Sequence, residues 1–547
     1  MKWTRRKFLA AGGATAAATS LAGAGAWRAA RPPVRRFSGG IVGGNSNLGH
    51  ALRDGKFPPP DGIRDVEVVI VGGGIAGLAA ARRWRRAGGE DFVLLELEAR
   101  AGGNAISGRN SVSAFPWAAH YVPISGSDAA EVTRLFEELG VITGRDPTGT
   151  PVYAEEFLCA DPMERLFIHG RWQEGFVPQT GLRAGDEPII QAFLAEMQRL
   201  KNFRGRDGRR AFTIPVDQSS GDEAFRKLDR MTMADYLASQ GWLTCEPLRW
   251  YVNYCCRDDY GAGISRISAW AGVHYFAARD GRAANAPDHA VVTWPEGNGW
   301  LAQQLEAGVA GKVQSECAVW NVETASDGFL VDYYDARARK SFRLRTRGVV
   351  WAAPAFIAQR AIQELREAGN RPAVVYSPWL VANLTLDAVP DGRGMAAAWD
   401  NVIYGSETSL GYVVATHQNV RPVPGHTVIT YYLPLDADEP ALARTKALTR
   451  SYDSWCEQIL AELAVAHPEI RAQVRNLDIW LWGHAMGRPV PGYIWGGGRE
   501  RAQLPLGNLV FAHSDQSGVA LFEEAYTRGV RAADELLGRL GGPPGQA

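Results

Sequence analysis

The chain has few cysteines, no excess of either charge and no long, strongly hydrophobic run. Only six of its 547 residues are cysteines, and their spacing fits neither a zinc site nor a disulfide framework. Lysine plus arginine and aspartate plus glutamate both total 59, so no overall positive field would attract a nucleic acid. These features argue against a metal site, a nucleic-acid partner and a protein with several membrane spans.

What the chain does contain is typical of a large globular protein. Its length is enough for two or more domains. Apolar residues make up 46 % of the sequence and charged residues 22 %, which is ordinary globular composition. Aromatic residues reach 10 %, with 18 tryptophans, enough to line a large apolar or cation-binding pocket.

The first 26 residues are typical of a targeting segment. Arg5 and Arg6 precede an alanine- and glycine-rich stretch at residues 10–26, which ends in the small-residue sequence 24–26. The segment resembles a twin-arginine export signal, which implies the twin-arginine export machinery as a partner and a periplasmic or exported location. A retained N-terminal membrane anchor is the alternative, although alanine and glycine contribute little to insertion. Residues 27–64 are rich in proline and glycine without a sustained period, and predict a linker or arm.

A glycine motif follows a short apolar strand. Residues 66–71 are β-branched and predict a buried parallel strand. Gly72, Gly74 and Gly77 fit G-x-G-x-x-G, and residues 78–87 predict a helix. In this motif the first glycine permits a tight turn, the second lets the backbone approach a diphosphate, and the third lets helix pack on strand. The arrangement predicts a dinucleotide site; a glycine-rich turn that only packs is the alternative.

The groups that would complete this site follow in the expected order. Ile75 and Ala76 lie where the helix N-terminus offers free N–H groups to phosphates. A second apolar run, residues 92–96, ends in Glu96, 19 residues after Gly77. A carboxylate in that position accepts hydrogen bonds from a ribose and repels a 2′-phosphate.

Gly102, Gly103 and Asn104 follow Glu96, and a second loop covers residues 116–121. With the glycine motif and Glu96, these patches resemble the flavin amine oxidase superfamily. The other patches are a strand meander within residues 313–354 that ends in proline and a C-terminal unit of strand (508–512), loop (513–518) and helix (522–537). Because a plain nicotinamide dehydrogenase does not need this late unit, the resemblance favours FAD over NAD.

The resemblance implies FAD as the cofactor, held without a covalent bond because no cysteine follows Cys456. It places Asp515 at the ribityl or diphosphate group and Val319 near the adenine. The implied cofactor-binding residues are Gly72, Gly74, Ile75, Ala76, Gly77, Glu96, Gly102, Gly103, Asn104, Ala118, Ala119, His120, Val319, Asp515, Gly518 and Val519. For His120 the alternative is a purely structural hydrogen bond.

The expected fold class is α/β. A Rossmann-like FAD-binding domain, with a central parallel sheet plus a β-meander, is interleaved with a second, mixed α+β substrate domain. The FAD-binding domain is expected at residues 65–126, 301–372 and 481–540, and the substrate domain at residues 127–300 and 373–480.

The sequence also departs from the superfamily pattern. Asn104 stands where amine oxidases usually carry arginine, and Arg100 and Arg109 are the candidates to replace that cation. Residues 374–401 contain no lysine, whereas many members have one there that reaches the flavin through water. Leu521 stands where monoamine oxidases supply one wall of an aromatic cage.

Aromatic side chains in the substrate half are candidates for the pocket wall. Trp482, His484 and Tyr493 directly precede the C-terminal strand, so we name them as catalytic candidates; plain core packing is the alternative. The pair Asp258–Asp259 fits a solvated, ion-paired turn better than recognition of a cationic amine. Cys255–Cys256 fits two buried thiols better than a redox pair.

The resulting hypothesis is an FAD-dependent oxidoreductase that oxidises an amine, with polyamines among the candidates, by hydride transfer to flavin N5. The products would be an imine, hydrolysed to an aldehyde, and a reduced flavin reoxidised by oxygen, a quinone or another acceptor. Two alternatives remain open. One is a desaturase or dehydrogenase like the protoporphyrinogen oxidases and carotenoid desaturases, acting on an apolar substrate; the other is a non-catalytic FAD-binding protein.

Overall fold

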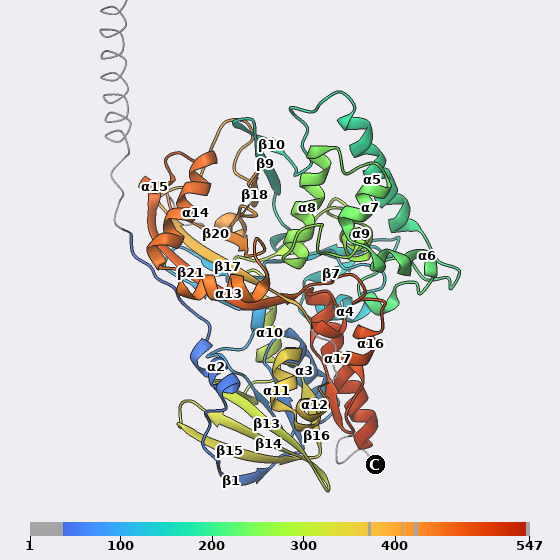
Figure 1. Ribbon diagram of the computed structural model, residues 1–547, viewed down its shortest axis with the longest axis vertical. Helices are drawn as coiled ribbons and strands as arrows, with labels where there is room; N and C mark the ends of the chain where they lie inside the picture. The colour runs from blue at the N-terminus through green and yellow to red at the C-terminus, as the bar shows by residue number, and fades with distance from the viewer. Residues whose placement is uncertain (1–36, 370–373, 407, 421–424, 543–547) are drawn as a thin grey trace, which may run out of the picture.

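The computed structural model describes residues 37–369, 374–406, 408–420 and 425–542, arranged as two lobes (Figure 1). The expected export signal at residues 1–26 lies outside the described residues. Among the helices that are described, none is both long enough and apolar enough to span a membrane. The lower lobe in Figure 1 contains the predicted dinucleotide motif, and the upper lobe contains most of the chain between the matching patches.

A five-stranded parallel sheet forms the centre of the lower lobe. Its order is β12 (Val313–Gln314), β3 (Phe92–Leu95), β2 (Val68–Val71), β16 (Gly348–Trp351) and β22 (Leu509–Phe511). Strand β2 is buried along its whole length, which explains its continuous β-branched sequence. Val68 and Ile70 pack toward the helices, whereas Val69 and Val71 pack toward the second sheet of this lobe. The expected parallel sheet is confirmed.

Helices cover one face of this sheet and a β-meander covers the other. The helices are α3 (Ile75–Arg86), α10 (Gly299–Ala307) and α17 (Phe522–Leu540), and α3 packs directly on α17. The meander is part of a four-stranded sheet in the order β1 (Pro60–Asp65), β15 (Lys340–Thr346), β14 (Gly328–Asp335) and β13 (Cys317–Ala325). A parallel sheet between helices and a meander is the Rossmann-like architecture that the motifs predict.

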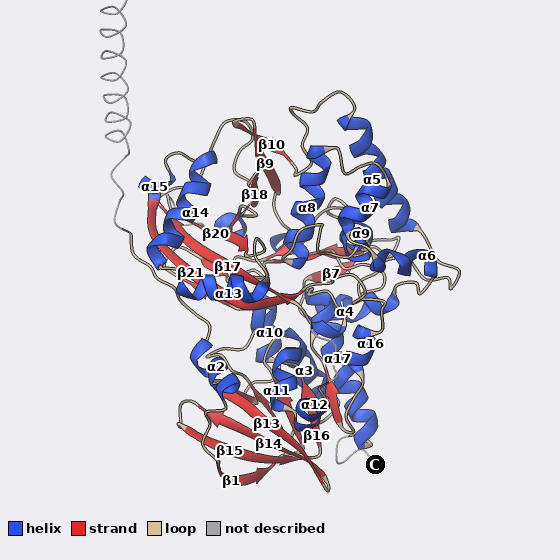
Figure 2. Cartoon of the chain, in the orientation of Figure 1, coloured by secondary structure: helices blue, strands red, loops and turns tan. Residues whose placement is uncertain are grey.

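The upper lobe is built on a seven-stranded sheet (Figure 2). Its order is β10 (Arg171–Glu174), β9 (Glu164–Ile168), β18 (Asp400–Ile403), β19 (Tyr412–Val414), β20 (Thr427–Pro434), β17 (Tyr376–Leu386) and β21 (Val474–Gly487). Helices α13 (Pro440–Thr449) and α14 (Tyr452–Ala466) cover one face. The other face packs on aromatic side chains, including Tyr254 of α8 (Glu246–Tyr260). Helices α5 (Asp186–Asn202), α7 (Met233–Ser239) and α9 (Ala269–Ala277) join α8 in a separate core.

The described part of the expected arm is more regular than its sequence predicts. Ser38 and Ile41 form β-bridges to the edge strand β21, and α2 (Ser46–Asp54) follows. The side chain of Asn45 accepts the N–H of Leu48 and caps this helix. Because the arm gains its order from a sheet edge and a cap, hydrophobic periodicity could not reveal it.

Candidate functional site

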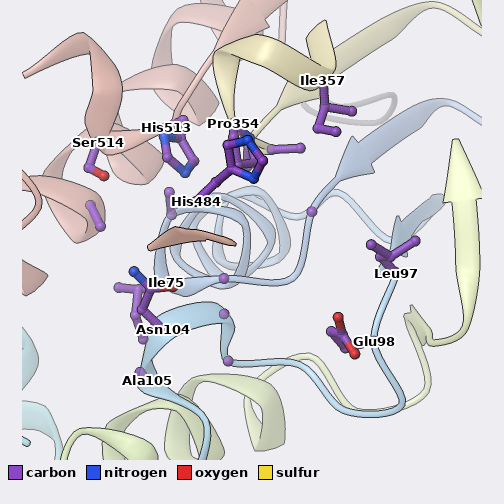
Figure 3. A pocket seen from close by; sticks show the side chains of 18 of the residues that line it. Ile75, Leu97, Glu98, Asn104, Ala105, Pro354, Ile357, His484, His513 and Ser514 are labelled. Atoms are coloured by element: carbon purple, nitrogen blue, oxygen red, sulfur yellow. The ribbon is translucent and has the colours of Figure 1, made fainter. Parts of the chain in front are cut away.

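A cavity of about 320 Å³ opens at the carboxyl ends of β2 and β3, between the two lobes (Figure 3). The glycine loop after β2 and the first turn of α3 form one wall, and β21 passes over the opposite side. Its lining includes many of the predicted cofactor residues: Gly72, Gly74, Ile75, Ala76, Glu96, Gly102, Gly103, Asn104, Ala119 and Val319. We refer to it as the cofactor cavity.

The three motif glycines have different physical roles. Gly72 has φ +99°, and a Cβ there would lie 2.9 Å from the backbone nitrogen of Ala353. A Cβ on Gly77 would lie 1.8 Å from the carbonyl oxygen of Gly72, so this glycine permits close packing. At Gly74 the nearest atom to a Cβ would be the Cα of Gly103, at 3.9 Å. Nothing in the protein therefore requires glycine at position 74, and the space that it leaves suits the approach of a ligand.

Two carboxyl groups lie at one end of the cofactor cavity. The Glu96 carboxylate accepts hydrogen bonds from the N–H groups of Gly73 (2.5 Å) and Glu98 (2.8 Å), and burial raises its pKa to about 7. Glu98 accepts the N–H of Asn45 at 2.9 Å, which ties the arm to this end. Figure 3 shows Glu98 and Leu97 at the end of the cavity away from Asn104 and Ser514.

These features fit a dinucleotide. The N–H groups in the first turn of α3 have no partner within the helix and face the cavity beside Gly74. The loop 72–76 would hold a diphosphate, Glu96 a ribose and Val319 the adenine. Asn104 also lines the cavity, and its Nδ2 donates one of its two hydrogens to the carbonyl oxygen of Ala485.

Other predicted cofactor residues lie outside the lining of this cavity. The Asp515 carboxylate accepts the N–H of Ala355 at 2.9 Å and the hydroxyl of Tyr376. Burial alone would raise the pKa of Asp515, but the nearby His513 ring and these hydrogen bonds outweigh it and lower that pKa. His513 and Ser514 line the cavity in its place. The other predicted residues outside the lining are Gly77, Ala118, His120, Gly518 and Val519.

A second cavity, of about 140 Å³, adjoins the first on the side of the seven-stranded sheet. Asn104, Ala119, Trp482 and Leu521 are among the residues that line both cavities. We refer to this cavity as the inner chamber.

Aromatic rings form one side of the inner chamber. His120 lies beside Tyr121, Trp399 and Tyr432, with ring centroids 5.1, 5.4 and 4.7 Å away. Burial lowers the pKa of His120 to about 4, so the ring is neutral at physiological pH. His120 therefore belongs to the chamber wall, where its Nδ1 lies 3.2 Å from the carbonyl oxygen of Ala118.

Charged side chains form another part of the chamber. Asp258 and Asp259 lie in the last turn of α8 and line it together with Arg279. Asp259 is paired with Arg279 at 2.7 Å. Burial and the neighbouring Asp259 raise the pKa of Asp258 to about 7, although Arg279 opposes this. The ion pair expected here is present, but the pair does not lie in a solvated turn, because both residues sit in the last turn of α8 and line the chamber.

The predicted catalytic residues do not form one group. Trp482 lines both cavities and donates from Nε1 to the carbonyl oxygen of Trp117 at 2.8 Å. His484 lines the cofactor cavity, where it stacks on Phe356 with ring centroids 4.2 Å apart. Tyr493 lies outside both linings, and its hydroxyl donates to the carbonyl oxygen of Asp515 at 2.8 Å. This contact holds the Asp515 loop in place, and the catalytic role of Tyr493 stays a prediction.

Several lining residues were missed by the sequence analysis. Arg279, Asn298 and Tyr432 come from separate segments without a motif, so no local signal identifies them. The proposed replacement cations are also absent from both linings: Arg109 pairs with Glu296 at 3.0 Å, and Arg100 is exposed.

Comparison with known proteins supports this arrangement. Residues 70–139 match the family model of an NAD(P)-binding Rossmann-like domain. A search of curated protein sequences gives no match.

Solved structures match over most of the chain. Wild-type putrescine oxidase bound to putrescine is 17 % identical, with a TM-score of 0.62, and the match covers 87 % of this chain and 100 % of that one. Cyclohexylamine oxidase from Brevibacterium oxydans IH-35A is 15 % identical, with a TM-score of 0.60 and the same coverage. A CLA-producing fatty acid isomerase from P. acnes is 15 % identical, with a TM-score of 0.57, and the match covers 86 % of this chain and 98 % of that one. The chain therefore has the fold of the FAD-dependent amine oxidases, built on a Rossmann-like dinucleotide-binding domain.

Proposed function

We propose that this protein is an FAD-dependent oxidoreductase that oxidises an amine, with diamines and polyamines as the favoured substrates. The cofactor cavity would hold the FAD through the loop 72–76, Glu96 and Val319. When bound, the flavin would accept a hydride from a substrate carbon next to nitrogen. The inner chamber, which adjoins this cavity beside Trp482, would hold the substrate.

The observation that carries the proposal is the combination of rings and carboxyl groups in the inner chamber. Asp259 is neutralised by Arg279, whereas no described side chain donates a hydrogen bond to the carboxyl group of Asp258. A substrate ammonium group beside Asp258 would favour its charged form. The rings of His120 and Tyr432, which pack on each other, would together form one wall beside the amine and exclude water from it.

An apolar substrate is the second candidate. Val381, Met486 and Leu521 give the inner chamber an apolar wall, and the fatty acid isomerase shares the fold. This observation favours a desaturase or dehydrogenase that acts on a carbon–carbon bond. The cost of burying Asp258 without a cationic partner argues for the amine instead.

The proposed location is the periplasm or the outside of the cell, reached through the twin-arginine machinery. The support is the pair Arg5–Arg6 ahead of the alanine-rich segment. Oxygen or a quinone would then reoxidise the cofactor. Replacing both arginines by lysine should leave the protein in the cytoplasmic fraction; unchanged fractionation would contradict export by this route.

The first test is an anaerobic titration of the FAD-loaded protein with monoamines, diamines, polyamines and an unsaturated fatty acid. Bleaching of the flavin band by an amine is the expected result. Bleaching only by the apolar compound would support the second candidate, and no bleaching by any donor would support a non-catalytic FAD-binding protein. Failure to bind FAD at all would contradict the proposal.

The variant Asp258→Asn tests whether the carboxyl group of Asp258 binds the substrate amine. It should weaken bleaching by diamines while leaving the flavin spectrum unchanged. Asp438→Asn is the matched control, because Asp438 forms a surface ion pair with Lys446 at 2.7 Å and lines neither cavity.

A further inference from the structure

The cofactor cavity has no permanent positive charge in its described lining. None of its described lining residues is a lysine or an arginine, and Glu96 and Glu98 both line it. A dinucleotide brings a doubly negative diphosphate to this place. The α3 N-terminus supplies only about half a positive charge. The site therefore needs another source of positive charge or of strong hydrogen-bond donors.

Two histidines are the side chains that can supply it. His484 comes from β21 and His513 from the loop after β22, and both line the cofactor cavity. Figure 3 shows both rings beside Pro354, on the opposite side of the cavity from Asn104. They thus face the cavity from the wall that lies across from η1, the short helix Gly103–Ala105.

The neighbours of His513 fix the direction of its ring. Its Nδ1 lies 3.1 Å from the backbone nitrogen of Asp515 and 3.1 Å from the Oδ2 of the same residue. In the neutral ring, Nδ1 accepts the Asp515 N–H, and the proton is then on Nε2. In the protonated ring, Nδ1–H donates to the Asp515 carboxylate instead. In both states Nε2–H remains as the donor for a ligand.

Asp515 is suited to support the charged form of this ring. It is 5 % exposed, and Ala355 and Tyr376 hold its carboxylate in place. A fixed carboxylate beside Nδ1 stabilises an imidazolium, as a negative phosphate beside Nε2 would. Asp515, which lies behind the cavity wall, would thus act on the cofactor through His513.

His484 has a different environment. Burial, and to a lesser extent the neighbouring Arg444 on α13 and His50 on α2, lowers the pKa of His484 to about 4. Its ring also packs edge-to-face on Tyr376 of β17, with centroids 5.8 Å apart. Without a ligand, this histidine is therefore neutral. A diphosphate in the cavity would oppose the repulsion from Arg444 and His50.

We propose that His513 and His484 form the positively charged side of the dinucleotide site, contacting the diphosphate, and that cofactor binding is accompanied by proton uptake at this pair. The proposal rests on the FAD-binding part of the proposed function and is independent of the substrate. In this proposal the two histidines neutralise the diphosphate, as a lysine or arginine would do in another protein. The consequence is a cofactor affinity that depends on pH.

The test is the affinity of the apoprotein for FAD, measured by quenching of flavin fluorescence between pH 6 and 8.5. We expect the affinity to fall with rising pH, by up to about tenfold per pH unit for one coupled proton. Calorimetry in buffers of different ionisation enthalpy should show an uptake of up to about one proton. Constant affinity and no proton uptake in the wild-type protein would overturn the proposal.

Variants separate the role of charge from a structural role. His513→Gln and His484→Gln should each weaken FAD binding and flatten its pH dependence, whereas His513→Lys should retain binding while flattening the pH dependence. Arg109→Gln is the control, because Arg109 is exposed and lies outside the cavity lining. Unchanged affinities in both glutamine variants would overturn the proposal. Wild-type protein that does not bind FAD at any pH would instead contradict the proposed function.

Discussion

The cofactor cavity and the inner chamber adjoin each other but are built in opposite ways. The cofactor cavity is made largely of backbone and small side chains from short, continuous segments, such as residues 72–76 and 102–105. The inner chamber is made of large or charged side chains from separate segments, including Asp258, Arg279 and Tyr432. A site that binds through the backbone imposes a local sequence pattern, whereas a site that binds through side chains needs only that the fold bring them together.

The largest effect should come from the glycines of the cofactor cavity. Gly77→Ala places a methyl group 1.8 Å from the carbonyl oxygen of Gly72, so we expect a loss of stability of about 3 kcal/mol or more. Gly74→Ala meets no atom closer than 3.9 Å and should change stability by less than about 1 kcal/mol.

The two variants should differ again in cofactor binding. The methyl group of Gly74→Ala would occupy ligand space, so FAD affinity should fall by at least about tenfold, or about 1.4 kcal/mol. Thermal unfolding of the apoprotein and FAD titration check both outcomes. If both variants lost the same stability, the claim that Gly77 is needed for packing and Gly74 only for ligand space would be wrong.

The next effect concerns the chamber alone. Asp258→Asn removes the charge that would bind a substrate ammonium, and hydrogen bonds to charged groups are worth about 1.5–3 kcal/mol. We therefore expect kcat/KM for a diamine to fall by about 10- to 100-fold at unchanged FAD affinity. Asp438→Asn should leave both values unchanged. A fall in FAD affinity with Asp258→Asn would show that the two cavities are not separable.

The pH dependence of stability gives a smaller effect at the same residue. The pKa of Asp258 is about 7 in the folded protein and near 4 in the unfolded chain. Its contribution to the free energy of unfolding is therefore fully present below about pH 4 and is lost as the pH rises through 7. Asp258→Asn should therefore gain stability relative to the wild-type apoprotein between pH 5 and 8. Denaturant unfolding at both pH values measures this difference. A difference that stays constant with pH would show that Asp258 is not the titrating group.

The smallest expected effect comes from the arm. Asn45→Ala removes the N-cap of α2 and should cost about 1 kcal/mol of local stability. Because Leu52 of α2 lines the cofactor cavity but not the inner chamber, FAD should dissociate moderately faster while KM for the amine stays unchanged. Amide hydrogen exchange of residues 46–54 and stopped-flow release of FAD check this. If KM for the amine changed while the rate of FAD release did not, the arm would act on the inner chamber and not on the cofactor cavity, contrary to this prediction.

The difference between the two cavities also explains which predictions were accurate. Strand β2, the glycine loop and α3 lie within a few residues of their predicted positions because each has a strong local signal. The pairing of Asp259 with Arg279 could not be predicted, because 20 residues and a helix end separate the two. Tyr493 lies outside the linings of both cavities, because proximity in sequence to β22 does not by itself place a side chain in either of them.

The sequence by itself determined the parallel sheet, the dinucleotide loop and the role of each motif glycine. These depend on backbone conformation and close packing, which adjacent residues control. Only the tertiary structure decided that Asp258 is buried beside the inner chamber, that Asp515 lies behind His513, and that the cofactor cavity is lined by histidines and no lysine or arginine within the described residues. Burial and charge pairing arise between segments far apart in the chain, so no local pattern of residues specifies them.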